Sequence, residues 1–138
     1  NEPYSGHLPG DAIDRHASAH GRPNALIELR NDLIADDAVF HSPVVHTPQV
    51  GKPLTMMYLI GAMKVFSAGT FEYSHQWDRP NGAVLEFHSE LDGITINGVD
   101  LIHWNDDNRI VNFKVMVRPL KAIEVVHRRM AAVLQARA

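Results

Sequence analysis

The chain has 138 residues, of which 45% are apolar and 21% are charged, and its formal net charge is −3 at pH 7. This length fits one globular domain, and the absence of cysteine excludes disulfides, iron–sulfur clusters and thiol catalysis. The balance of 16 carboxylates against 13 Lys and Arg argues against a nucleic-acid partner, because phosphate binding needs clustered basic side chains.

The hydropathy pattern gives no sign of a membrane partner or of secretion. No stretch reaches the roughly 18 to 20 apolar residues that a membrane span requires. The first ten residues lack the apolar core of a secretory signal, and no Asn-x-Ser/Thr acceptor occurs. We therefore expect a cytoplasmic location.

The amino-terminal third has a helical tendency. Residues 1–22 are expected to form a loosely structured segment with a short helix, and residues 23–138 a single domain. A better helix is predicted from Asn24, because Leu26, Leu29, Leu33 and Ile34 fall at helical spacing before two aspartates interrupt the pattern. Residues 38–42 then read as a strand that ends before a proline.

A second helix is predicted from Pro53 to about Gly69, since proline favours the first helical position. Its apolar residues form two stripes, one through Met57 and Val65 and another through Leu59 and Phe66. A helix that is apolar on two sides is expected to be buried on two sides.

The remaining sequence alternates with a period of two and then returns to a helical pattern. Four antiparallel strands are predicted near residues 71–77, 85–91, 94–104 and 110–117, joined by short turns. A bulge or bend is expected at Asn97-Gly98. Pro119 opens a final amphipathic helix. Helices, then a strand meander, then a helix indicate an α+β fold.

Several local strings, in this order, resemble the nuclear transport factor 2-like (NTF2-like) superfamily, in its SnoaL-like and ketosteroid-isomerase-like branch. They are Leu-Ile-Ala-Asp-Asp-Ala-Val-Phe-His-Ser-Pro at 33–43, Gly51 with Tyr58-Leu59, Gly-Val-Asp-Leu-Ile-His-Trp at 98–104 and Asn-Arg-Ile-Val at 108–111. The resemblance spans residues 24–118. It implies a cone-shaped, cystatin-like fold, with a curved sheet wrapped on helices around an apolar pocket, and a homodimer through the outer sheet face.

The resemblance transfers function only in part. Asp100 matches the isomerase aspartate that stays protonated in an apolar pocket and donates a hydrogen bond to a developing oxyanion. The proton-shuttling aspartate of the isomerases falls at Ser42, and the last-strand aspartate of related epoxide hydrolases falls near Val115. Serine and valine supply no comparable base, which argues against both activities.

Two residues are candidates for proton transfer. Asp100 is surrounded by apolar sequence, which should raise its pKa; the alternatives are that it caps a turn or pairs with Arg118. His75 shares a strand face with Tyr73 and Trp77, so it is expected to point inward and to act as a base. The alternative for His75 is a hydrogen-bonded core residue.

These observations lead to two functional readings. The first is a protein that binds a small apolar molecule and acts as an isomerase, cyclase or hydratase by proton transfer, without cofactor or metal. The second is a non-catalytic ligand-binding or protein-interaction module, which leaves open whether the chain is an enzyme. The remaining alternative is a dimer scaffold that has no pocket and therefore no ligand. The residues expected to contact the ligand, besides Asp100 and His75, are Ser42, Tyr58, Phe71, Tyr73, Trp77, Phe87, Trp104 and Phe113.

Overall fold

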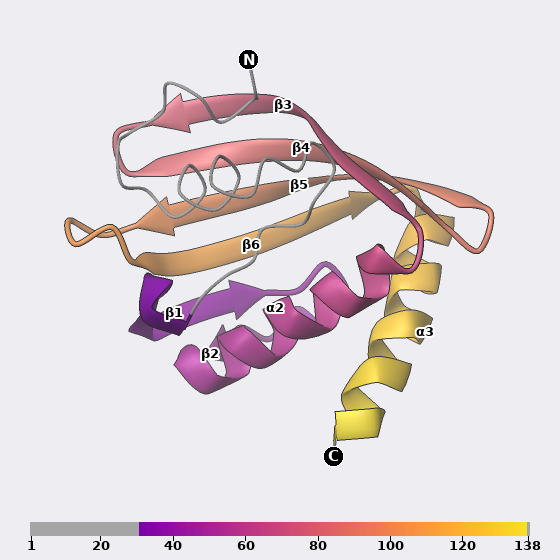
Figure 1. Cartoon of the computed structure of the whole chain (residues 1–138), viewed down its shortest axis with the longest axis horizontal. Helices are drawn as coiled ribbons and strands as arrows, with labels where there is room; N and C mark the ends of the chain where they lie inside the picture. The colour runs from indigo at the N-terminus through magenta and orange to yellow at the C-terminus, as the bar shows by residue number, and fades with distance from the viewer. Residues whose placement is uncertain (1–30, 138) are drawn as a thin grey trace.

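The computed structural model describes residues 31–137 (Figure 1). A short 3-10 helix, η1, is followed by six strands and two long helices within this range. Their bounds are η1 Asn31–Leu33, β1 Ile34–His41, β2 Gln49–Val50, α2 Lys52–Ser67, β3 Thr70–Arg79, β4 Gly82–Leu91, β5 Ile94–Trp104, β6 Ile110–Arg118 and α3 Leu120–Arg137. The expectations for residues 1–30, including the terminal segment and its helix, lie outside the described residues.

The strands form one curved sheet in the order β2-β1-β6-β5-β4-β3. Neighbouring strands are antiparallel except for β1 and β6, which pair in parallel. The predicted meander of four strands is therefore confirmed as β3 to β6. Helix α2 packs on β1 and against α3, and α3 also contacts β5 and β6 (Figure 1). The predicted α+β class is confirmed.

The helix predicted from Asn24 is wrong where it overlaps the described chain. Leu33 ends the 3-10 helix η1, and Ile34 begins strand β1. Ile34 pairs with Ile110 of β6 and is fully buried, as is Ala38. The helical spacing of apolar residues at 29, 33 and 34 is local, whereas pairing with a strand 70 to 80 residues away decides the backbone conformation.

Helix α2 is confirmed and is buried on two sides. It begins after Gly51, whose φ of 104° is accessible to glycine, and has a proline in its first turn. Thr55 and Leu59 face β1, and the Thr55 hydroxyl donates a hydrogen bond to the Ala38 carbonyl at 3.2 Å. On another side Gly61 lies against Met130 of α3.

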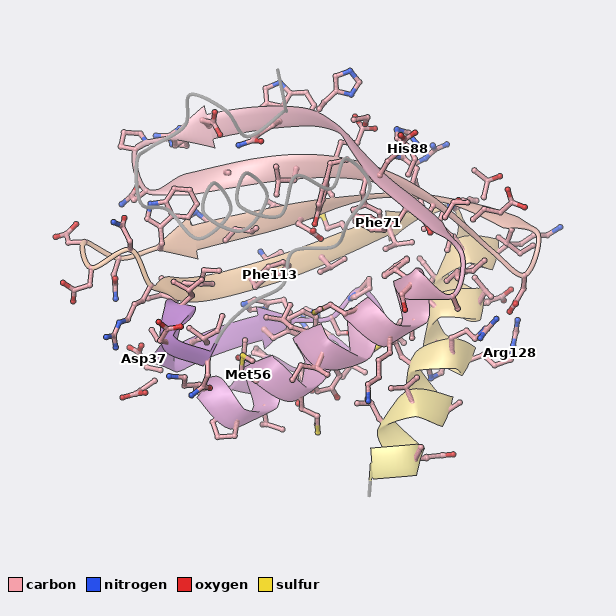
Figure 2. The ribbon with its side chains drawn as sticks, in the orientation of Figure 1. Asp37, Met56, Phe71, His88, Phe113 and Arg128 are labelled. Atoms are coloured by element: carbon pink, nitrogen blue, oxygen red, sulfur yellow. The ribbon has the colours of Figure 1, made fainter. Side chains whose placement is uncertain are left out.

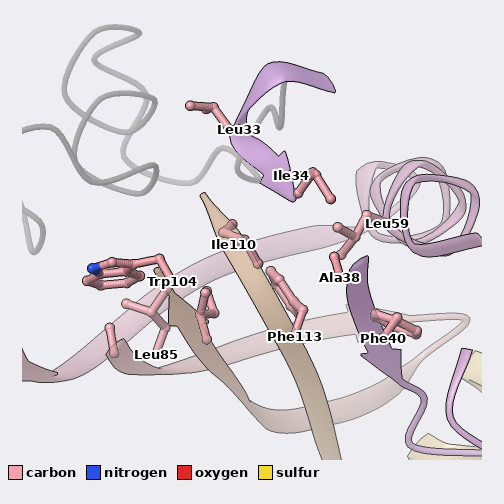
Figure 3. Packing of buried hydrophobic residues seen from close by; sticks show 11 residues of the cluster. Leu33, Ile34, Ala38, Phe40, Leu59, Leu85, Trp104, Ile110 and Phe113 are labelled. Atoms are coloured by element: carbon pink, nitrogen blue, oxygen red, sulfur yellow. The ribbon is translucent and has the colours of Figure 1, made fainter. Parts of the chain in front are cut away.

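Two groups of buried side chains fill the space between the sheet and the helices. In the first, Leu59 of α2 meets Ala38, Phe40 and Phe113, and Trp104 lies at the other end of the group (Figure 3). The second joins α2, α3 and the other ends of the strands, through Phe66, Phe71, Phe87, Ile96, Val125 and Val126. Phe71 and Phe113 project from the sheet toward α2 (Figure 2). Arg128 of α3 points away from the sheet and from α2.

The irregularities of the meander do not fall where the sequence predicts them. Strand β5 pairs without interruption with β4 from Ile94 to His103, so the bulge expected at Asn97-Gly98 is wrong. The register shifts instead in β3, between Tyr73 and His75, and in the pairing of β5 with β6, next to Trp104. The shift in β3 decides which of its side chains face the interior.

Candidate functional site

A pocket of about 240 Å³ lies between the inner face of the sheet, helices α2 and α3, and the loop after β1. Aromatic side chains of four strands and of α2 form part of its wall. They are Phe40, Tyr58, Phe66, Phe71, Tyr73, Phe87 and Phe113. Ligand sites are typically concave and mostly apolar, with few polar groups that fix orientation, and this cavity has that character.

Asp100 supplies the carboxyl group of the pocket. It lies in β5 opposite Leu85 of β4 and Val115 of β6, and only 7% of its surface is exposed. Burial disfavours the charged carboxylate and raises the pKa of Asp100 from 3.8 to about 7, although a hydrogen bond from Tyr73 acts in the opposite direction. Asp100 therefore exists in both protonation states near neutral pH.

Tyr73 of β3 reaches Asp100 across strand β4. Its hydroxyl donates a hydrogen bond to Oδ2 of Asp100 at 2.9 Å. Its ring meets the rings of Phe71 and Phe87 edge to face, at centroid distances of 5.0 and 6.5 Å. Among the described residues, Asp100 neither caps a turn nor pairs with Arg118: it lies within strand β5, and Arg118 donates a hydrogen bond to Asn97.

Tyr58 and Ser42 both line the pocket, as the sequence predicted. Tyr58 of α2 stacks on Phe40 at 5.3 Å and lines the cavity with its half-buried side chain. Ser42 also lines it, but its hydroxyl oxygen accepts the backbone N–H groups of Val44 and Val45 at 3.0 and 3.2 Å. The Ser42 side chain thus stabilises a local turn, which is a common role of serine in loops.

The expectation that His75 points into the pocket is wrong. The His75 side chain is 64% exposed, and its Nδ1 lies 3.1 Å from Oε1 of Glu86 on the outer face of the sheet. The physical reason is the bulge in β3, because an extra residue in one strand reverses the alternation of every side chain beyond it. No proton transfer inside the cavity can be assigned to His75.

The two tryptophans also lie outside the cavity. Trp77 follows the same bulge, so it faces outward opposite Val84 and is 56% exposed. Trp104 is buried in the first core group and is not among the residues that line the cavity. Phe87 and Phe113, by contrast, lie in the pocket wall, as do Tyr58, Phe71 and Tyr73.

Sequence reasoning missed the contribution of the last helix and of the loop after β1. Met130 and Leu134 of α3 line the cavity, with His127 at its edge, and Val44 and Val45 line it from the loop. The apolar spacing of α3 indicates a buried face, but it does not distinguish residues that touch a cavity from residues that touch the core.

Histidines near the first strand do not assemble a metal site. Nε2 of His41 lies 3.1 Å from Nδ2 of Asn112, and burial lowers the pKa of His41, whereas His46 is exposed. Across residues 31–137, no three His, Asp or Glu side chains converge to hold a metal ion. Within the same range, no helix is long and apolar enough to cross a bilayer.

The chain is similar to several solved structures. A steroid delta-isomerase from Pseudomonas aeruginosa superposes with a TM-score of 0.80 and 32% identity, over 94% of this chain and 96% of that protein. A bacterial protein with a cystatin-like fold from Silicibacter pomeroyi gives a TM-score of 0.68 and 28% identity, over 74% and 71% of the two chains. No protein-family model and no curated protein matches the sequence.

More distant structures share the fold alone. A putative SnoaL-like polyketide cyclase from Jannaschia superposes with a TM-score of 0.56 at 7% identity, over 69% of this chain and 74% of the cyclase. The curved six-stranded sheet with two helices on its inner face is the α+β fold that these structures share. The chain belongs to the NTF2-like superfamily.

Proposed function

We propose that this protein binds a small, neutral, largely apolar ketone and isomerises it by proton transfer, without a cofactor. The observation that carries the proposal is the Asp100 carboxyl in an apolar pocket, with a pKa raised to about 7. A general base works best when its pKa lies near the operating pH. None of the lining residues is Lys or Arg, which favours an uncharged ligand.

The base expected at His75 is outside the pocket, so Asp100 takes both roles in the proposed reaction. The Asp100 carboxylate removes a proton from the carbon next to the ketone: a C–H bond breaks, an O–H bond forms, and the substrate becomes an enolate. The same O–H then returns its proton to a carbon further along the conjugated system. The double bond has moved, and Asp100 is a carboxylate again.

The name of a similar protein supports catalysis over simple binding, and the pocket volume bears on the size of the substrate. The steroid delta-isomerase from Pseudomonas aeruginosa, 32% identical over nearly its whole length, is named for a double-bond isomerisation. The pocket volume of about 240 Å³ lies just below the roughly 300 to 1,000 Å³ of typical ligand sites, which favours a compact ketone.

The test is the conversion of β,γ-unsaturated ketones to conjugated enones, followed by ultraviolet absorbance. Both a compact substrate, 3-cyclohexenone, and a Δ5-3-ketosteroid are offered to the protein. Asp100→Asn is expected to reduce kcat/KM by about 100-fold or more, because the amide cannot take up the proton. His75→Ala is the matched control and should retain the rate, since His75 lies on the outer face. Equal rates from Asp100→Asn and the unaltered protein would refute the proposal.

A second candidate function is a non-catalytic ligand-binding module. It is favoured by Ser42, which stands where the resembling isomerases carry their base and whose oxygen is engaged in a turn. In this case the unsaturated ketones bind, as measured by quenching of protein fluorescence, but neither is converted at any pH.

We also propose that two copies associate through the outer face of the sheet. Trp77 and Met116 are exposed there, at 56% and 48%, beside the half-buried side chains of Val84, Val99 and Leu101. The register places them in adjoining rows, Trp77 with Val84 and Leu101, and Val99 with Met116. Exposed apolar residues that adjoin on one face are typical of an interaction surface.

A further inference from the structure

The β3 bulge places Tyr73 in the interior. Tyr73 pairs with Phe87, and His75 pairs with the next residue of β4, Glu86, so Ser74 is the extra residue on β3. Directly opposed residues of paired strands point to the same face. Tyr73 therefore points inward with buried Phe87, and His75 points outward with Glu86. Without the bulge, both Tyr73 and His75 would face the cavity.

Gly98 makes room for the Phe87 ring, on which Tyr73 packs as its hydroxyl reaches Asp100. Phe87 lies opposite Gly98 in the pairing of β4 with β5, and a Cβ atom on Gly98 would stand 2.4 Å from Cζ of Phe87. The phenyl ring thus lies over the glycine, in space that any other side chain would fill. Tyr73 packs edge to face on this ring and reaches over β4 to the carboxyl two residues beyond Gly98.

From this geometry we infer that Tyr73 is a positioning residue, which holds Oδ2 of Asp100 and leaves Oδ1 as the atom that exchanges a proton with the ligand. The inference rests on the proposed function and deepens it, because it assigns the reacting atom. It also restricts the substrate, because the reactive C–H bond of the bound molecule must lie next to Oδ1, the oxygen that Tyr73 does not hold.

The hydrogen bond has the direction that such a role needs. Tyr73 donates to Oδ2, so Oδ1 can gain and lose a proton while this bond persists. A proton on Oδ2 would face the phenol instead and would compete with its O–H group. The bond also stabilises the carboxylate, and in this way it opposes the effect of burial on the pKa of Asp100.

The other groups around Asp100 leave Tyr73 as its specific partner among the described residues. The titratable side chains on the pocket lining, apart from Asp100, are Tyr58 of α2, Tyr73 of β3 and His127 of α3. Strands β4 and β6 contribute apolar side chains, namely Phe87, Phe113, Val115 and Val117. Of these titratable groups, Tyr73 is the one that acts on the pKa of Asp100.

The experiment is an NMR titration of the Asp100 carboxyl carbon in protein labelled with 13C at aspartate Cγ, assigned with Asp100→Asn. Tyr73→Phe keeps the ring and removes the donor, so the titration midpoint should rise by about one pH unit or more, the size expected for a hydrogen bond to a charged group. Replacing Tyr73 by 3-fluorotyrosine, a stronger donor, should lower the midpoint. Tyr58→Phe is the control and should leave it unchanged.

A midpoint that stays the same in Tyr73→Phe, or that moves equally in Tyr58→Phe, would overturn the inference. If Tyr73 had a purely structural role, the titration midpoint of Asp100 would not move in opposite directions in Tyr73→Phe and in the 3-fluorotyrosine protein. The titration needs no substrate, so it is separate from the test of the proposed function. If neither ketone is converted but the midpoints move as expected, the isomerase proposal fails and Tyr73 still orients the carboxyl toward a bound ligand.

Discussion

At the scale of single residues, Asp100 carries a free-energy cost that links the stability of the protein to pH. Its carboxyl group is buried, and its pKa rises from 3.8 to about 7. Between these values the folded protein holds a proton that the unfolded chain has released. The unfolded state binds fewer protons, so the free energy of unfolding falls as the pH rises through this window.

Asp100→Asn should therefore stabilise the protein in alkaline solution. A pKa difference from 3.8 to about 7 corresponds to at most about 4 kcal/mol across the whole window. Urea unfolding of both proteins at about pH 4.5 and at about pH 8.5 checks this expectation. The unaltered protein should lose stability between the two conditions, and Asp100→Asn should lose much less. Exposed Asp106→Asn is the control, and a slope shared by all three proteins would contradict the prediction.

At the scale of elements, close packing between strands β4, β5 and β6 holds Phe87 in the pocket wall. Gly98 lies between Phe87 of β4 and Met116 of β6, and a Cβ atom there would stand 2.4 Å from the Phe87 ring and 2.6 Å from the Met116 carbonyl oxygen. Backbone in a paired strand cannot move away without loss of hydrogen bonds. Glycine is needed here for space, since a positive φ is not involved.

Gly98→Ala should destabilise the protein by about 2 to 3 kcal/mol, the cost of overpacking a core, in spite of the smaller entropy loss of alanine. It should also displace Phe87 and weaken ligand binding. Thermal unfolding measures the first effect and fluorescence titration the second. Thr95→Ala, an exposed change in the same strand, should have a much smaller effect. Gly98→Ala with unaltered stability would show that the sheet accommodates the methyl group.

At the scale of the whole molecule, the two faces of the sheet have different roles. The inner face lines the pocket and meets α2 and α3, whereas the outer face carries Trp77, Met116 and the Glu86 cluster. Glu86 accepts a hydrogen bond from Asn97 at 3.0 Å and lies within 3.7 Å of His75 and His88. The hydrogen bond from Asn97 and the two nearby histidines lower the pKa of Glu86. The outer face therefore carries a negative charge at neutral pH beside its exposed apolar side chains.

If the outer face joins two copies, Met116→Lys should separate them. A lysine would bring one charge per copy into the apolar part of a self-complementary interface, where like charges repel. Light scattering coupled to size-exclusion chromatography should give about twice the monomer mass of 15.4 kDa for the unaltered protein and the monomer mass for Met116→Lys. Leu120→Lys, at a 69% exposed position on α3, is the control and should remain dimeric. A monomeric unaltered protein would contradict the proposal.

The sequence by itself determined the α+β class, the meander of β3 to β6, the two helices α2 and α3, and the pocket position of Asp100, Tyr58, Phe87 and Phe113. These features follow from local periodicity, from turn residues and from family resemblance. The sequence also predicted a strand from residue 38, but tertiary structure alone decided that residues 34–37 belong to the same strand, because their partner β6 lies far along the chain.

Tertiary structure also decided the chemistry of the pocket. One extra residue in β3 turned His75 and Trp77 outward and left Tyr73 inside, and nothing in the local pattern of alternating residues marks Ser74 as that extra residue. The sequence suggested a bulge at Gly98. In the structure this glycine has no side chain where the Phe87 ring lies, and so it leaves room for that ring. Register is a property of paired strands, so the identity of the group that meets Asp100 depends on contacts between distant segments.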